Sequence, residues 1–89
     1  MALIDLLGRR WVLRILWELR AEPLTFRALQ RACDDISPSV LNQRIGELRE
    51  TALVTLGDDG YRLSDLGREL LTHFLPLAKW AQSWEKALR

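Results

Sequence analysis

The clearest helix start in the chain reads Ile36-Ser37-Pro38-Ser39-Val40-Leu41-Asn42-Gln43-Arg44-Ile45. Ser37 suits the N-cap position because its hydroxyl can accept a hydrogen bond from a free amide of the first turn. Pro38 fits the first helical position, where a missing N–H costs nothing. Ile36 and Leu41 can pack together as a hydrophobic staple. These features predict a helix that runs from residue 37 to about residue 51.

This helix has one apolar stripe and an opposite polar face. At about 100° per residue, the positions that share the apolar stripe are Leu41, Ile45, Leu48 and Ala52. The positions opposite them are Ser39, Gln43, Gly46 and Glu50, with Asn42 on the flank. We therefore expect the first set in the core and the second set at the surface.

Two helices are predicted before this one. After the short apolar segment 4–7 and Gly8, residues 9–21 carry apolar side chains at helical spacing. The main stripe of this helix consists of Val12, Ile15, Leu16 and Leu19. Thr25 can cap the next helix, expected over residues 25–33, with Leu24 and Leu29 as its staple.

A hairpin and a C-terminal helical segment are predicted after it. Residues 53–56 and 61–63 resemble strands, joined by the turn Gly57-Asp58-Asp59-Gly60. Ser64 can cap a helix over residues 65–88, which Pro76 either kinks or divides in two. Spacings of four and three link a heptad seam made of Leu70, Phe74, Leu77, Ala81, Trp84 and Leu88.

Length and composition limit the possible functions. A chain of 89 residues has room for one compact domain, 48% hydrophobic and 28% charged, which is typical of a folded soluble protein. One Cys and one His cannot form a structural zinc site or an internal disulfide, so we expect no metal, no cofactor and a cytoplasmic protein. No stretch has the length of a membrane span and no signal peptide is expected. The net charge of +1 does not by itself indicate nucleic-acid binding.

The predicted order of elements is that of a winged helix-turn-helix domain, mostly α with a small β-hairpin. In that fold the helix over 25–33 supports the helix over 37–51, which enters the DNA major groove. We expect residues 1–64 to form the core with its wing, and residues 65–89 to form a C-terminal dimerisation segment.

A further set of segments consists of Gly8-Arg9-Arg10-Trp11, Thr25-Phe26-Arg27-Ala28-Leu29, Ile36-Ser37-Pro38 with Val40-Leu41-Asn42-Gln43-Arg44-Ile45, Ala52-Leu53-Val54, Tyr61-Arg62-Leu63-Ser64 and Leu66-Gly67-Arg68. These segments resemble the HxlR-type regulators, which are distantly similar to MarR-type proteins. The resemblance implies a homodimeric transcriptional regulator that binds double-stranded DNA. Many members carry a redox-sensing cysteine before the first helix, which this sequence does not show. The acidic wing tip, Ser39 and Gly46 stand where members often have basic residues, so weak DNA binding is expected.

Within this frame, Asn42 and Gln43 are candidates to read adenine edges, because their amides match adenine N6 and N7; a merely solvated face is the alternative. Ser37 and Ser39 are further DNA-binding candidates at the start of the same helix. The candidates for phosphate contacts are Thr25, Arg27, Arg31, Arg44 and Arg62. For Arg27, Arg31 and Arg44, pairing with a nearby carboxylate of the same chain is the competing interpretation.

The tryptophans favour an interface over a ligand cage, because aromatic residues at helical spacing usually pack against protein. The expected dimer interface comprises Leu13, Trp17, Leu70, Phe74, Leu77, Trp80, Ala81, Trp84 and Leu88. Cys33 is expected to be a packed thiol. The sequence offers no nucleophile–base pair and no Gly-rich phosphate-binding loop, so it does not indicate an enzyme. The alternative to a DNA-binding regulator is a winged-helix protein-interaction module with weak or lost DNA binding. No small-molecule effector can be read from the sequence.

Overall fold

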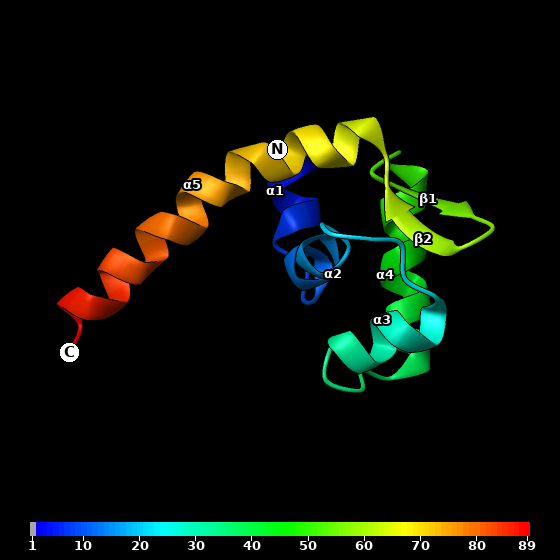
Figure 1. Ribbon diagram of the computed structural model, residues 1–89, viewed down its shortest axis with the longest axis horizontal. Coiled ribbons are helices and arrows are strands. Elements are labelled where there is room, and N and C mark those ends of the chain that lie inside the picture. Colours follow the sequence, from blue (N-terminus) through cyan, green and yellow to red (C-terminus); the bar gives the residue numbers. More distant parts are fainter. Residues whose placement is uncertain (1) are drawn as a thin grey trace.

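The computed structural model, which describes residues 2–89, consists of helices and one small antiparallel hairpin that projects from the edge of the molecule (Figure 1). The elements in chain order are α1 (Ala2–Leu7), α2 (Val12–Glu18), α3 (Phe26–Ala32), α4 (Pro38–Glu50), β1 (Val54–Gly57), β2 (Gly60–Leu63) and α5 (Asp65–Ala87). The prediction of a mostly helical winged helix-turn-helix with a long C-terminal helix is confirmed.

The core lies between α2, α3, α4 and the hairpin. Its buried side chains are Val12, Ile15, Leu16, Leu19, Leu29, Cys33, Ile36, Leu41, Ile45, Leu48, Leu53, Val54 and Leu63. The predicted stripe of the first long helix is buried completely, and so are three of the four stripe positions predicted for α4. Burial of these apolar side chains supplies the main favourable free energy of folding.

The N-terminal region differs from the prediction of one helix over 9–21. Residues 2–7 already form α1, and α2 spans only Val12–Glu18. Trp11 separates the two with a φ of 79°, in the left-handed region that non-glycine residues seldom adopt. The chain therefore turns sharply at residues 8–11, and this turn faces α4.

The helix-turn-helix itself forms as predicted. The Thr25 hydroxyl accepts a hydrogen bond from the Ala28 amide at 3.2 Å, and the Ser37 hydroxyl accepts one from the Val40 amide at 3.3 Å. Asp34 and Asp35 make the turn between α3 and α4 with φ values of 59° and 57°. Helix α4 ends before Ala52, which is exposed with a φ of 64°. The prediction that Ala52 continues the buried stripe is therefore wrong, because the helix has already ended.

The wing is a β-hairpin with a two-residue turn. Strands β1 and β2 pair antiparallel with Val54 opposite Leu63 and Gly57 opposite Gly60, which leaves Asp58 and Asp59 at the tip. Leu24 adds an isolated bridge to Tyr61, with N···O distances of 2.9 and 2.8 Å in the two directions. The hairpin is thus fastened to the segment that precedes α3.

Helix α5 continues through Pro76 as one helix, whereas the sequence left open whether this proline kinks the segment or divides it in two. The Ser64 hydroxyl caps it by accepting a hydrogen bond from the Gly67 amide at 3.0 Å. Figure 1 shows the first half of α5 running over α1 and α2 and the second half extending beyond the body. Within residues 2–89, no helix combines the length and apolar character needed to cross a membrane.

Candidate nucleic-acid interface

The outer face of α4 carries the residues predicted to read bases. Asn42, Gln43 and Ser39 are all exposed, while the opposite side of the helix is buried by Leu41, Ile45 and Leu48. A Cβ placed on Gly46 would meet nothing within 4 Å, so the chain itself does not require glycine there. The structure therefore presents a polar, unobstructed helix face of the kind that a major groove admits.

At the start of α4, the Ser37 hydroxyl is already engaged in capping the helix. The Ser37 hydroxyl serves as the cap acceptor and also lies 3.0 Å from the Ser39 hydroxyl. Ser37 is thus first a structural residue, and Ser39 is the more available of the two. Thr25 has the same capping role at the start of α3.

Arg27 and Arg31 lie one turn apart on the exposed side of α3. Neither forms an ion pair within the described residues 2–89, and Asp34 pairs with Arg14 at 3.3 Å. The competing interpretation, in which Asp34 occupies these arginines, is not what the structure shows. Both guanidinium groups remain available for a phosphate.

Arg44 pairs with a carboxylate of the same chain, the competing interpretation to a phosphate contact. Its Nη1 lies 2.6 Å from Glu47 Oε1 and its Nε donates a hydrogen bond to the Arg10 carbonyl oxygen at 3.0 Å. Arg9 pairs with the other oxygen of the same carboxylate. Burial alone would raise the pKa of Glu47, but the hydrogen bonds from Arg9 and Arg44 outweigh it and hold the pKa below its usual value.

The wing offers little positive charge. Arg62, the basic residue of the hairpin, pairs with Asp59 at 2.6 Å. This hydrogen bond lowers the pKa of the Asp59 carboxyl. Asp58 lies exposed beside it, so the hairpin carries a net negative charge.

Two arginines that the sequence did not single out, Arg49 and Arg9, also lie on or beside α4. Arg49 is exposed in the last turn of α4, and it borders an open groove of about 550 Å³ that Gly46, Glu50, Val54, Thr55 and Leu56 also line. Its spacing of seven from Asn42 places both residues on one side of the helix and could have identified it. Arg9 had no comparable signal, because its partner Glu47 lies 38 positions along the chain.

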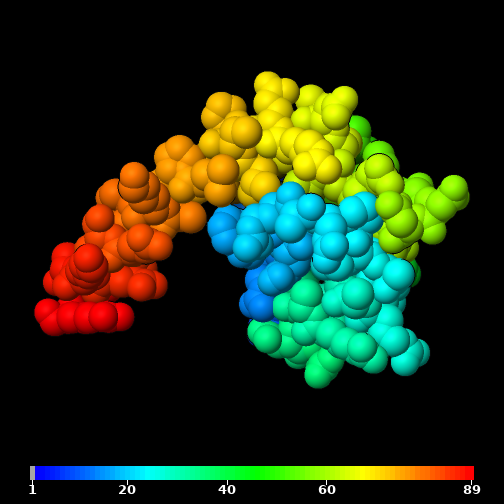
Figure 2. Space-filling view, viewed as in Figure 1, coloured from blue at the N-terminus to red at the C-terminus, as the bar shows by residue number. Residues whose placement is uncertain are grey.

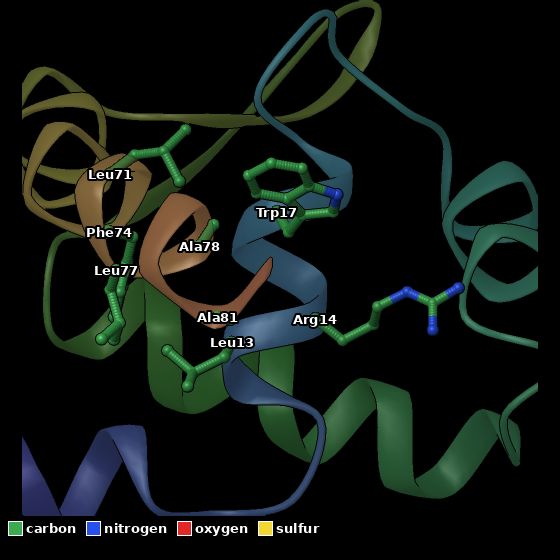
Figure 3. A pocket seen from close by; sticks show the side chains of 8 residues that line it. All are labelled: Leu13, Arg14, Trp17, Leu71, Phe74, Leu77, Ala78 and Ala81. Carbon is green, nitrogen blue, oxygen red and sulfur yellow. The ribbon is translucent and has the colours of Figure 1, made fainter. Parts of the chain in front are cut away.

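A hollow lies between α2 and the middle of α5 (Figures 2 and 3). It has a volume of about 390 Å³, and its lining consists of Leu13, Arg14, Trp17, Leu71, Phe74, Leu77, Ala78 and Ala81. Figure 3 shows the Arg14 guanidinium pointing away from the others, toward its hydrogen bond with the Ala32 carbonyl oxygen at 2.7 Å. The surface of this hollow is therefore almost wholly apolar.

The residues predicted for a dimer interface fall into two groups. Leu70, Phe74, Ala81 and Trp17 are half-buried, and Leu70 and Phe74 pack against the core of the same chain. The exposed group consists of Leu13, Leu77, Trp80, Trp84 and Leu88. Trp80 and Trp84 stack on each other with ring centroids 6.3 Å apart. This second group is a surface that a soluble monomer would rarely leave open.

Cys33 has the packed environment that was expected. It is fully buried in the core, and burial raises the pKa of its thiol to about 11 despite the nearby charge of Arg14. Within residues 2–89, no group of three or more His, Cys, Asp or Glu side chains gathers as metal ligands would.

Known proteins of similar sequence are transcriptional regulators. Residues 6–88 match the family model described as HxlR-like helix-turn-helix. The HTH-type transcriptional regulator YvaP of Bacillus subtilis is 30% identical over 88 residues, which span 91% of this chain and 82% of YvaP. A second B. subtilis HTH-type transcriptional regulator, YdzF, is also 30% identical, over 90% of this chain and 81% of its own length.

Solved structures agree with this assignment. Quinone-bound YodB from B. subtilis superposes with a TM-score of 0.85 at 28% identity and covers 92% of this chain and 93% of the YodB chain. A possible HxlR family transcriptional factor from Thermoplasma volcanium shares the fold with a TM-score of 0.83, at 21% identity over 94% of this chain and 82% of its own. The protein belongs to the HxlR-like helix-turn-helix family of transcriptional regulators, and not to an enzyme family.

Proposed function

We propose that the protein binds double-stranded DNA as a homodimer, with α4 in the major groove. The exposed polar face of α4 is the observation that carries this proposal: within residues 2–89 nothing buries Ser39, Asn42 and Gln43, while the opposite side of the helix packs in the core. The amides of Asn42 and Gln43 would donate to and accept from adenine edges. Ser39 would contact a base or a phosphate near the start of the helix.

Phosphate contacts would come from the supporting helix. Arg27 and Arg31 are one turn apart and unpaired within residues 2–89, so a single DNA strand could meet both. Arg49 would contact the backbone at the other end of α4. The backbone amides at the capped starts of α3 and α4, beside Thr25 and Ser37, add a weaker attraction for phosphate. Arg44 and Arg62 would take part only after leaving their carboxylate partners.

The second copy would pack on α5. The exposed apolar residues Leu77, Trp80, Trp84 and Leu88 extend beyond the body of the chain, next to the apolar hollow under α5. A dimer would bury both surfaces, and a chain with so small a core gains stability from a shared interface. Residues 65–89 would then be the dimerisation segment, and two α4 helices would read two half-sites.

A salt titration of binding to duplex DNA tests this function. With about three arginines per subunit on phosphate, a dimer makes about six contacts, so log affinity should fall with log salt at a slope near −5. The acidic wing makes the binding weak for a protein of this type. Affinity that is absent, or that does not depend on salt, would instead favour a protein-interaction module.

A further inference from the structure

The Glu47 carboxylate joins two parts of the chain that are distant in sequence. One oxygen pairs with Arg44, one turn back on α4, and the other pairs with Arg9 in the turn between α1 and α2. The Arg44 Nε adds a hydrogen bond to the Arg10 carbonyl in that turn, at 3.0 Å. We call the set Arg9, Arg10 carbonyl, Arg44 and Glu47 the α4 clamp.

The α4 clamp borders the proposed reading face. Glu47 is four residues beyond Gln43, so the two side chains are neighbours on the same side of the helix. Its side chain is only 15% exposed and that of Arg44 19%, whereas Arg9 is 50% exposed. The carboxylate is therefore enclosed by guanidinium groups and does not face the surface as an open charge.

We propose that Glu47 is a positioning residue for DNA recognition: it fixes α4 on the turn between α1 and α2 and holds Arg9 and Arg44 away from phosphates. This inference rests on the proposed DNA binding by α4. Two free arginines beside the reading face would attract any DNA sequence equally, because phosphate contacts carry no sequence information. With Glu47 in place, binding depends more on the contacts of Asn42 and Gln43.

Glu50→Gln provides a matched control. Glu50 is also on α4, exposed, and makes no ion pair within residues 2–89, so its neutralisation removes the same charge and leaves every group of the α4 clamp in place. Glu47→Gln and Glu50→Gln should both fold, as circular dichroism and urea unfolding would verify. Any difference between them in DNA binding then reports on the α4 clamp and not on net charge.

The experiment compares affinity for a duplex enriched from a random pool by the wild-type protein with affinity for random duplex, each at several salt concentrations. Glu47→Gln should bind random duplex more tightly, with a salt slope steeper by about 0.9 for each arginine released to a phosphate. Its preference for the enriched duplex should fall roughly fivefold or more, the lower range for a lost base contact. Glu50→Gln should raise both affinities alike and keep the preference.

Two results would overturn the proposal. Equal behaviour of Glu47→Gln and Glu50→Gln would show that only the charge matters. A preserved preference in Glu47→Gln would show that α4 needs no such positioning. Failure of the proposed function has a different signature, since the wild-type protein would then show no salt-dependent affinity for either duplex.

Discussion

Arg62 Nη2 donates a hydrogen bond to Asp59 Oδ1 at 2.6 Å within the wing turn. The basic side chain best placed to follow a DNA strand from the wing is thus neutralised by its own hairpin. With Asp58 beside it, the hairpin repels phosphate. We therefore expect the wing to add little to any affinity for DNA.

Asp58→Lys should therefore strengthen binding to any DNA sequence. The substitution replaces an exposed negative charge by a positive one at the wing tip, and one added phosphate contact should steepen the salt slope by about 0.9 per subunit. Fluorescence anisotropy with random duplex at several salt concentrations measures both effects. The same exchange at Asp65, at the start of α5 and away from the turn at the wing tip, is the control, and equal gains from both would argue against contact by the wing tip.

Gln43→Ala and Arg27→Ala should have different consequences. Loss of a base contact by Gln43 should cost about 1–3 kcal/mol on an enriched duplex and little on random duplex. Loss of a phosphate contact by Arg27 should weaken both about equally and reduce the salt slope. Equal losses for Gln43→Ala on both duplexes would remove Gln43 from base reading.

Trp84→Ala should shift the protein from dimer to monomer. Trp84 is 51% exposed on the apolar side of α5, where the second copy is proposed to pack. Leu75→Ala removes a side chain of 48% exposure on another side of the same helix and should leave the dimer intact. Sedimentation velocity at several protein concentrations distinguishes the two variants. Dissociation by Leu75→Ala, or a dimer unaffected in Trp84→Ala, would contradict this interface.

The two helical glycines should respond in opposite directions to alanine. A Cβ on Gly67 would lie 2.3 Å from the Leu53 carbonyl oxygen, so Gly67→Ala forces α5 away from the hairpin and should destabilise the fold. Gly46 has open space around it, so Gly46→Ala should stabilise by about 1 kcal/mol through helix propensity. Urea unfolding measures both. A destabilised Gly46→Ala would mean that α4 needs the flexibility of glycine there.

Cys33 should make stability fall at alkaline pH. The buried thiol has a pKa of about 11, above that of a thiol exposed in the unfolded chain. As the pH rises from about 9 to about 11, the thiol of the unfolded chain loses its proton first, and the free energy of unfolding decreases. The decrease should be smaller in Cys33→Ala. Parallel pH profiles for the two proteins would show that Cys33 does not contribute.

The fold could be predicted because its local signals agree. Capping by Thr25 and Ser37, the stripe of α4 and the acidic turn of the hairpin all depend on neighbours within a few residues. The break at Trp11 could not be predicted, since nothing in the apolar periodicity of residues 9–21 indicates a left-handed backbone there. The continuity of α5 through Pro76 was open for a similar reason: sequence shows the lost hydrogen bond but not whether the helix tolerates it.

The candidate site, too, could be predicted from the sequence only in part. Exposure of Asn42, Gln43 and Ser39 follows from helical period, and the pairs Arg44–Glu47 and Asp59–Arg62 have a spacing of three that sequence alone displays. The choice between such a pair and a phosphate contact depends on geometry. The Arg9–Glu47 pair depends on how the turn before α2 meets α4, which only the tertiary structure reveals.

Backbone amide mapping by NMR tests the central claim most directly. On titration of the 89-residue protein with an enriched duplex, amide signals should shift for the first half of α4 and the exposed side of α3, around Gln43 and Arg27, while those beyond residue 79 stay in place. Shifts confined to α5 or to the hollow beneath it, with α4 unchanged, would contradict DNA reading by α4.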